Sequence, residues 1–228
     1  MSEVRVLSAR RALTTPRAAA VAGIVFAVLY GTSQGLIRMS TPTGGVMDSA
    51  WLQANSGTIA LALDLMPYAG IAFLWFIGVI RDRLGDVEDR FIATVFLGSG
   101  LLFLALTFVG AAVSGGLLAS YAVAPSALDE SVLTFGREVI YQVINIYAVR
   151  MAGVFMISLG TIWLRTGLMH RAWAILTYGL ALVLLVSISH SLWVTLIFPG
   201  WVLAVSVYFL IRSKRDPSLE QMDEAGAA

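Results

Sequence analysis

Long apolar stretches separated by short polar segments make up most of this chain. Six such stretches occupy residues 18–37, 57–80, 91–113, 140–164, 172–188 and 192–211. A helix of about 20 apolar residues crosses the hydrocarbon core of a bilayer, where lipid cannot satisfy backbone N–H and C=O groups. The pattern therefore predicts an all-α fold, a polytopic transmembrane helical bundle with six spans.

The positive charges are distributed unevenly between the polar segments. Of the 15 Lys and Arg residues, 12 lie before the first stretch, after the sixth, or in the segments that follow the second and the fourth. The segments on the other side hold only Arg38 and Arg137. Because cytoplasmic segments are enriched in Lys and Arg, both termini are predicted to be cytoplasmic. We expect a multi-pass protein of the plasma membrane, the inner membrane of a bacterium.

The same pattern predicts the domain organisation. Residues 1–17 form a cytoplasmic N-terminal segment, residues 18–211 the transmembrane domain, and residues 212–228 a polar cytoplasmic tail. The basic N-terminus and the first apolar stretch also fit a cleaved signal peptide. However, the sequence GTSQGLIR after Tyr30 contains no small-x-small cleavage site. A retained first helix is therefore expected.

The composition excludes several classes of function. Hydrophobic residues make up 58% of the chain and charged residues 13%. A soluble domain carries about 25% charged residues, so no soluble domain is expected. Cysteine is absent, which removes disulfides, thiolate catalysis and cysteine metal sites. No basic patch is interleaved with aromatic residues, so nucleic acid is not an expected partner. No catalytic residue and no cofactor are predicted.

Two opposite charges lie inside the apolar stretches. Asp64 occurs in LALDLMPYAG and Arg150 in IYAVRMAGVF. A charge at the bilayer centre costs roughly 2.5–3.5 kcal/mol, so such residues usually face the protein interior and find a partner. We expect Asp64 and Arg150 to pair. The pair is either a site for a proton, an ion or a charged solute, or a structural ion pair between two helices. In the third interpretation the two charges are unpaired. Pro67 predicts a kink nearby, which frees carbonyls for a cation or water, or is an ordinary bend.

Further polar residues are expected in the same half of the bundle. Glu138, Gln142 and Asn145 recur at spacings of four and three residues, so they share one helix face. Tyr30 and Gln34 lie at the outer end of the first stretch. The outer half of the bundle is therefore the predicted location of a cavity. The alternative is ordinary hydrogen bonding between helices, at about 0.6 kcal/mol per contact.

The segment between the third and fourth stretches carries a helix-start pattern. Ser126 is followed by Asp129 and Glu130, which resembles an N-cap with acids in the first turn. This pattern predicts a short helix that lies flat on the outer surface. An irregular connector is the alternative.

Gly31 to Gly35 fits two patterns at once. As G-x-x-x-G it is a face for close helix packing. As G-x-S-x-G, with Ser33 as nucleophile, it requires a strand–turn–helix that a membrane helix does not provide. His170 and His190 are predicted on opposite sides of the membrane. Asp48, Glu138 and His190 come from three segments without a characteristic spacing, so no metal site is predicted.

The cytoplasmic segment after the second stretch invites one resemblance. The loop motif of major facilitator transporters is matched at four positions, Gly78, Asp82, Arg83 and Gly85. Asp86 stands where that motif has a basic residue. The segment resembles that family over about nine residues. A short amphipathic turn with charge pairs accounts for it equally well, and no function is carried over.

Three classes of function follow from these features. The leading hypothesis is an integral membrane protein, not an enzyme, that binds or passes a small solute, ion or lipid at Asp64 and Arg150. The second is a structural or accessory subunit, with a second copy or another membrane protein as its partner. The third is a membrane enzyme that acts on lipid with Ser33, Glu138 and His190 at the outer face.

Overall fold

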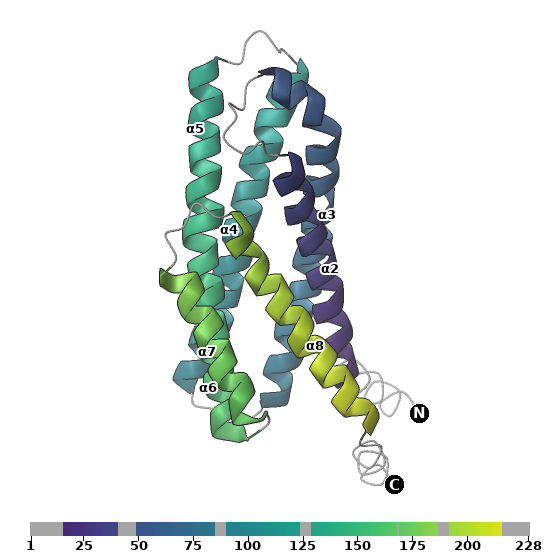
Figure 1. Cartoon of the computed structure of the whole chain (residues 1–228), viewed down its shortest axis with the longest axis vertical. Helices are drawn as coiled ribbons and strands as arrows, with labels where there is room; N and C mark the ends of the chain where they lie inside the picture. The colour runs from purple at the N-terminus through teal and green to yellow at the C-terminus, as the bar shows by residue number, and fades with distance from the viewer. Residues whose placement is uncertain are drawn as a thin grey trace, which may run out of the picture.

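The regular structure of the protein is entirely helical in the residues that the structure describes. This computed structural model describes residues 16–40, 49–84, 90–123, 129–167, 169–186 and 192–215. The all-α prediction is confirmed (Figure 1). The α-helices are α2 (Pro16–Ser40), α3 (Ser49–Leu84), α4 (Arg90–Val123), α5 (Glu130–Tyr141), α6 (Val149–Thr166), α7 (Arg171–Val186) and α8 (Ile197–Arg215). A π-helix, η3 (Gln142–Ala148), joins α5 to α6, and a 3-10 helix, η4 (Leu192–Leu196), precedes α8.

Five of the helical segments are long and apolar enough to cross a membrane, which is compatible with an integral membrane protein. They correspond to α2, α3, α4, the continuous rod α5–η3–α6 and α8. Helix α7 is apolar but has only 16 residues, about 24 Å at 1.5 Å per residue. Five of the six predicted spans are therefore candidate membrane-spanning helices by length and composition. The sixth span and the cytoplasmic position of the ends stay predictions.

Several helices extend well beyond the apolar stretches. α3 begins at Ser49 rather than near residue 57, α4 continues to Val123, and α5 begins at Glu130. Hydropathy marks only the most continuous apolar part of each helix, so the ends of these helices were missed. The prediction of a short flat helix is wrong, because α5 continues directly into η3 and α6. Asp129 is the helix N-cap, but its side chain accepts from Ser131 Oγ at 3.0 Å and makes no capping hydrogen bond to the backbone. Ser126 lies outside the described residues.

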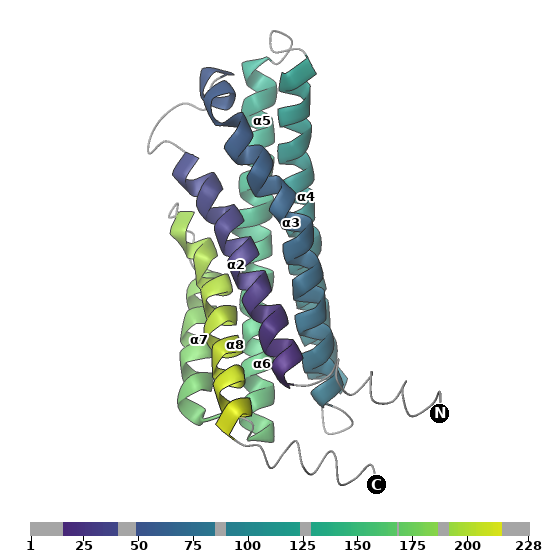
Figure 2. The same cartoon turned by 90° about the vertical axis from the view of Figure 1, so that its right-hand side faces the viewer.

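The helices run roughly along one axis as a bundle. The start of α2 and the end of α8 lie at the same end, and α3, α4 and α5 extend further than α2 at the other end (Figures 1 and 2). α2 packs between α3 and α8, and α6 packs against α4 and α7. At one crossing Gly23 lies directly against Ser206 of α8 and Phe76 of α3. The absence of a side chain at Gly23 is what permits this close approach.

A cluster of phenylalanine rings holds the bundle together at its centre. Phe73 of α3 is fully buried and contacts four rings from other helices. The centroid distances from Phe73 run from 4.6 Å to 5.7 Å. These four rings belong to Phe26, Phe103, Phe155 and Phe198. Since α2, α3, α4, α6 and α8 each contribute one ring, this cluster fixes their relative positions.

Candidate functional site

Asp64 and Arg150 do not form the predicted ion pair. Both residues belong to the described part of the chain, and no salt bridge joins them there. Asp64 is exposed on α3, on a surface shared with Leu61 and Tyr68. Arg150 instead donates from Nη1 to the backbone carbonyl of Ile146, at 2.9 Å. Helical spacing does not fix the direction in which a side chain points, so the expected contact is absent from the described residues. A binding role for Asp64 and Arg150 stays a prediction.

The structure brings other polar residues together at the end of α2. Tyr30, Gln34 and Arg38 are spaced by four residues, so they lie along one face of the helix. The Gln34 amide Nε2 donates to the Tyr30 hydroxyl at 2.9 Å, and both side chains are buried. The buried part of this polar face therefore leads along α2 to Arg38.

Arg38 is the centre of a contact between three helical segments. Its Nη2 donates to Oδ1 of Asn145 in η3 at 3.0 Å and to Oγ1 of Thr195 in η4 at 3.3 Å. Asn145 in turn donates from Nδ2 to the Tyr141 carbonyl at 3.3 Å. We call Arg38, Asn145 and Thr195 the Arg38 site. It joins residues that are 107 and 157 positions apart in the chain.

Both partners of Arg38 come from helical segments that are not α-helical. η3 is a π-helix and η4 is a 3-10 helix. A π-helix bonds to the fifth residue along the chain, which widens the turn, and such segments occur frequently at functional sites. The wider turn also explains why the predicted stripe of Glu138, Gln142 and Asn145 does not stay on one face. Asn145 faces Arg38, whereas Glu138 and Gln142 are exposed.

The charge of Arg38 is only partly compensated. Both of its side-chain partners among the described residues, Asn145 and Thr195, are neutral. Its Nε is buried and has no hydrogen-bond partner. The side chain as a whole is half-buried, so part of it remains reachable from the surface. A half-buried guanidinium with unused donors is a suitable group for binding a carboxylate or a phosphate.

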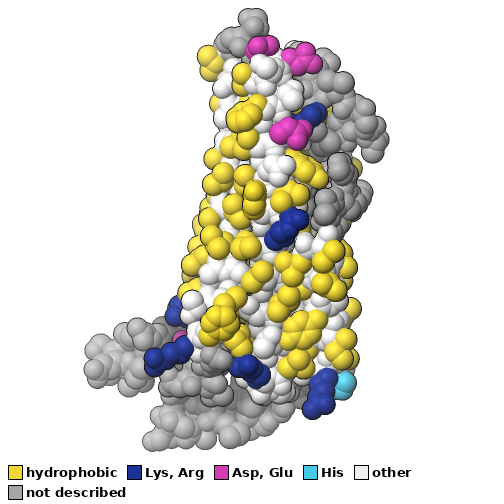
Figure 3. Space-filling view, turned by 90° about the vertical axis from the view of Figure 1, so that its left-hand side faces the viewer, with side chains coloured by type: hydrophobic (Ala, Val, Ile, Leu, Met, Phe, Trp, Pro, Cys, Tyr) yellow, Lys and Arg dark blue, Asp and Glu magenta, His cyan; other side chains and the backbone are white. Residues whose placement is uncertain are grey.

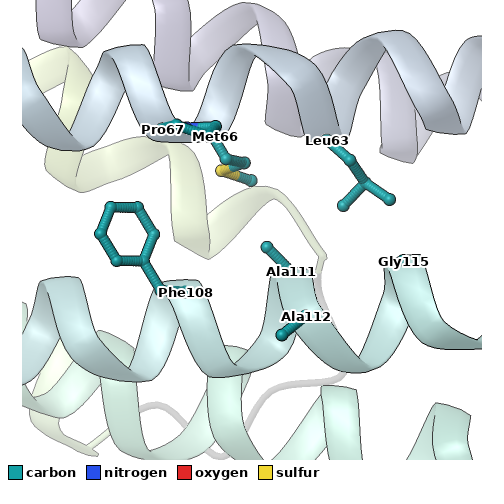
Figure 4. Close-up of a pocket in the computed structure, with 7 residues that line it drawn as sticks. All are labelled: Leu63, Met66, Pro67, Phe108, Ala111, Ala112 and Gly115. Atoms are coloured by element: carbon teal, nitrogen blue, oxygen red, sulfur yellow. The ribbon is translucent and has the colours of Figure 1, made fainter.

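The remaining predicted site residues lie elsewhere. Glu138 accepts from Arg137 Nη2 at 3.2 Å, and both side chains are exposed. Helix α3 continues through Pro67, which lines a shallow apolar groove between α3 and α4 of about 320 Å³. In Figure 4 the side chain of Leu63 points across this groove toward Gly115 of α4. The groove contains no polar side chain that could orient a charged solute.

The hydrolase and metal hypotheses gain no support. Ser33 is fully buried within α2, and its hydroxyl donates to the Ala62 carbonyl at 2.6 Å. It is thus a packing contact between α2 and α3. His190 and Asp48 lie outside the described residues. Within the described ranges no group of three or more acidic, histidine or cysteine side chains is arranged to hold a metal ion.

The segment that resembles the major facilitator loop motif is described only in part. Gly78 and the exposed Asp82 belong to α3, whereas Gly85 and Asp86 lie outside the described residues. Comparison with protein families, characterised proteins and solved structures found no match to this chain. The function must therefore be argued from the geometry alone.

Sequence reasoning identified Gln34 and Asn145 but missed Arg38 as a site residue. Arg38 was used only to assign the orientation. The available signal was its position four residues after Gln34, on a side of the membrane where Lys and Arg are scarce. Its contact with Thr195 is not readable from local spacing, because it depends on how α8 packs against α2.

Proposed function

We propose that this chain is a multi-pass plasma-membrane protein that binds an anionic group at the Arg38 site. The observation that carries the proposal is the half-buried guanidinium of Arg38, which has neutral side-chain partners and a buried, unpartnered Nε. A half-buried charge with only neutral partners is costly, and an anion that contacts the accessible part of the guanidinium offsets that cost. The function is thus recognition of a carboxylate or phosphate.

The distribution of charge supports an orientation with Arg38 at the outer surface. On the face shown in Figure 3, most Lys and Arg side chains gather at the end where α2 begins and α8 ends. Arg38 lies 21 residues after Arg17, which corresponds to about 32 Å along α2. That distance matches the roughly 30 Å thickness of the hydrocarbon core. Arg38 would then lie at the outer membrane–water interface, with α7 as the sixth span.

Two sources can supply the anion at that interface. One is the phosphate of a phospholipid headgroup, and the other is a small carboxylate or phosphate solute in water. A guanidinium recognises both through parallel N–H···O hydrogen bonds. The site therefore predicts the chemical class of the ligand, and the experiment must separate the two sources.

The test compares Arg38→Gln with Arg137→Gln. Arg137 is exposed and already paired with Glu138, so it is a matched control for the loss of one positive charge. Thermal unfolding is measured in phosphatidylcholine nanodiscs, with and without phosphatidylglycerol, and with and without inorganic phosphate. Ligand at one hundred times its Kd stabilises a protein by about 2.7 kcal/mol. We expect this stabilisation in the wild type and the Arg137 variant, and its loss in the Arg38 variant.

A second variant keeps the test decisive if Arg38→Gln does not fold. Asn145→Asp places a carboxylate at the position of the amide oxygen that Arg38 contacts at 3.0 Å. The new carboxylate should stabilise the anion-free protein and abolish its response to added anion. A response that persists in Asn145→Asp contradicts the proposal.

A further inference from the structure

A second feature concerns the exposed face of α3. Asp64 is exposed there beside Leu61 and Tyr68, which are 53% and 64% exposed. Counted from Arg81 at the arginine-rich end, Asp64 lies 17 residues along α3, about 26 Å. It is thus within a hydrocarbon core about 30 Å thick, near its outer edge. A carboxylate on a surface that faces lipid requires a cation.

The surface beside Asp64 is shaped to admit another helix. Asp64 is about 60° around α3 from Pro67, because each residue turns a helix by about 100°. Pro67 lines the groove between α3 and α4, whose α4 wall includes Ala111, Ala112 and Gly115. Small residues let a neighbouring helix approach closely in a membrane. Asp64 therefore borders an apolar groove whose α4 side is formed by these small residues and by Phe108.

The chain itself carries the complementary charge. Arg150 is partly exposed on α6, and its only hydrogen bond within the described part of the chain is to the Ile146 carbonyl. Counted from Arg165, Arg150 lies 15 residues along α6, about 23 Å. Measured from the same end of the bundle, the two charges thus differ in depth by only about 3 Å.

We propose that two copies of this chain form a dimer in which Asp64 of each copy pairs with Arg150 of the other. Helix α4 packs against both α3 and α6, the two helices that carry these charges. A two-fold axis that runs beside α4 along the membrane normal creates two equivalent contacts. In each of them α3 of one copy packs against α6 of the other. Two-fold dimers of this kind are the commonest symmetric assemblies. The proposal does not depend on anion binding at Arg38.

The direct test is disulfide cross-linking between copies with both charges intact. The chain has no cysteine of its own. Leu61→Cys and Tyr147→Cys place thiols one helical turn from Asp64 and from Arg150, at positions 53% and 57% exposed. Chains with the two substitutions, co-expressed with different tags in native membranes, should form mixed disulfide-linked dimers. Neither chain expressed alone should form this disulfide. A control chain that carries Val21→Cys, at an exposed position of α2, in place of Leu61→Cys should form no mixed dimer.

The charge dependence is tested by self-association in lipid bilayers. Asp64→Asn and Arg150→Gln should each weaken dimerisation about three- to twentyfold, the range for one polar contact between membrane helices. The double exchange Asp64→Arg with Arg150→Asp should restore it. The absence of mixed cross-links overturns the proposal. It is equally overturned if Asp64→Asn weakens association and Arg150→Gln does not, since the cation then comes from a different subunit or from lipid.

Discussion

Replacement of Phe73 by alanine tests whether the phenylalanine cluster is the main stabilising contact of the bundle. In a soluble protein this change costs about 3–5 kcal/mol, partly because the ring returns to water on unfolding. In a bilayer the unfolded helix keeps its ring in lipid, so the water-transfer part is small. The remaining cost is the cavity: about 100 Å³ at about 24 cal/mol per Å³ gives about 2.4 kcal/mol.

The loss of ring contacts adds to the cavity term. Phe73 packs against Phe26 at 4.6 Å and against Phe103 and Phe155 at 5.4 Å each. Aromatic pairs contribute about 0.5–1.5 kcal/mol each in double-mutant cycles, although these energies partly overlap with the cavity term. We therefore expect Phe73→Ala to lower the free energy of unfolding by about 3 kcal/mol.

The assay is reversible unfolding in mixed micelles of a mild detergent and sodium dodecyl sulfate, followed by tryptophan fluorescence. Phe135→Ala is the matched control, because it removes the same atoms from a side chain that is 71% exposed on α5. The control should change the free energy of unfolding by less than about 0.5 kcal/mol. If the two variants lose the same amount, or Phe73→Ala loses less than about 1 kcal/mol, the cluster is not the stabilising element.

Two further predictions concern other contacts of the core. Gly23→Ala should destabilise the fold by about 1–3 kcal/mol, because the added Cβ overlaps Ser206 Oγ and the Phe76 ring; Gly31→Ala, with open space around it, should be tolerated in the same thermal unfolding assay. Thr177→Val should cost about 1–3 kcal/mol and alter the tryptophan emission spectrum, since it leaves the buried Trp201 Nε1 without its acceptor at 2.9 Å.

The sequence predicted the positions of the helices well because lipid imposes a simple condition on them. Every backbone polar group in the hydrocarbon core must be paired within a helix, so each long apolar stretch is a helix. The helical ends at Ser49, Val123 and Glu130 were not predictable in this way. The ends at Ser49 and Glu130 lie in polar sequence, where both helix and loop are compatible with water. Before Val123, Gly115 and Gly116 interrupt the apolar run.

The site was predicted less well because it depends on rotation and on long-range packing. Depth along a helix follows from counting residues, and this count places Asp64 and Arg150 at similar depths. The direction of each side chain depends on which helices become neighbours, and that is decided by contacts such as those of Phe73 and Gly23. Local spacing within α2 was sufficient to group Gln34 with Tyr30, because that contact lies within one helix.

The π-helix η3 has a consequence for the whole rod from Glu130 to Thr166. One turn of π-helix accommodates about one extra residue, so the outer third is rotated by about 100° relative to an uninterrupted α-helix. The side chains of the outer and inner parts of the rod therefore follow two separate helical phases. Deleting a single residue from 142–148 would restore one continuous α-helical phase. Asn145 would turn away from Arg38, while the packing of α6 against α4 and α7 would stay in place.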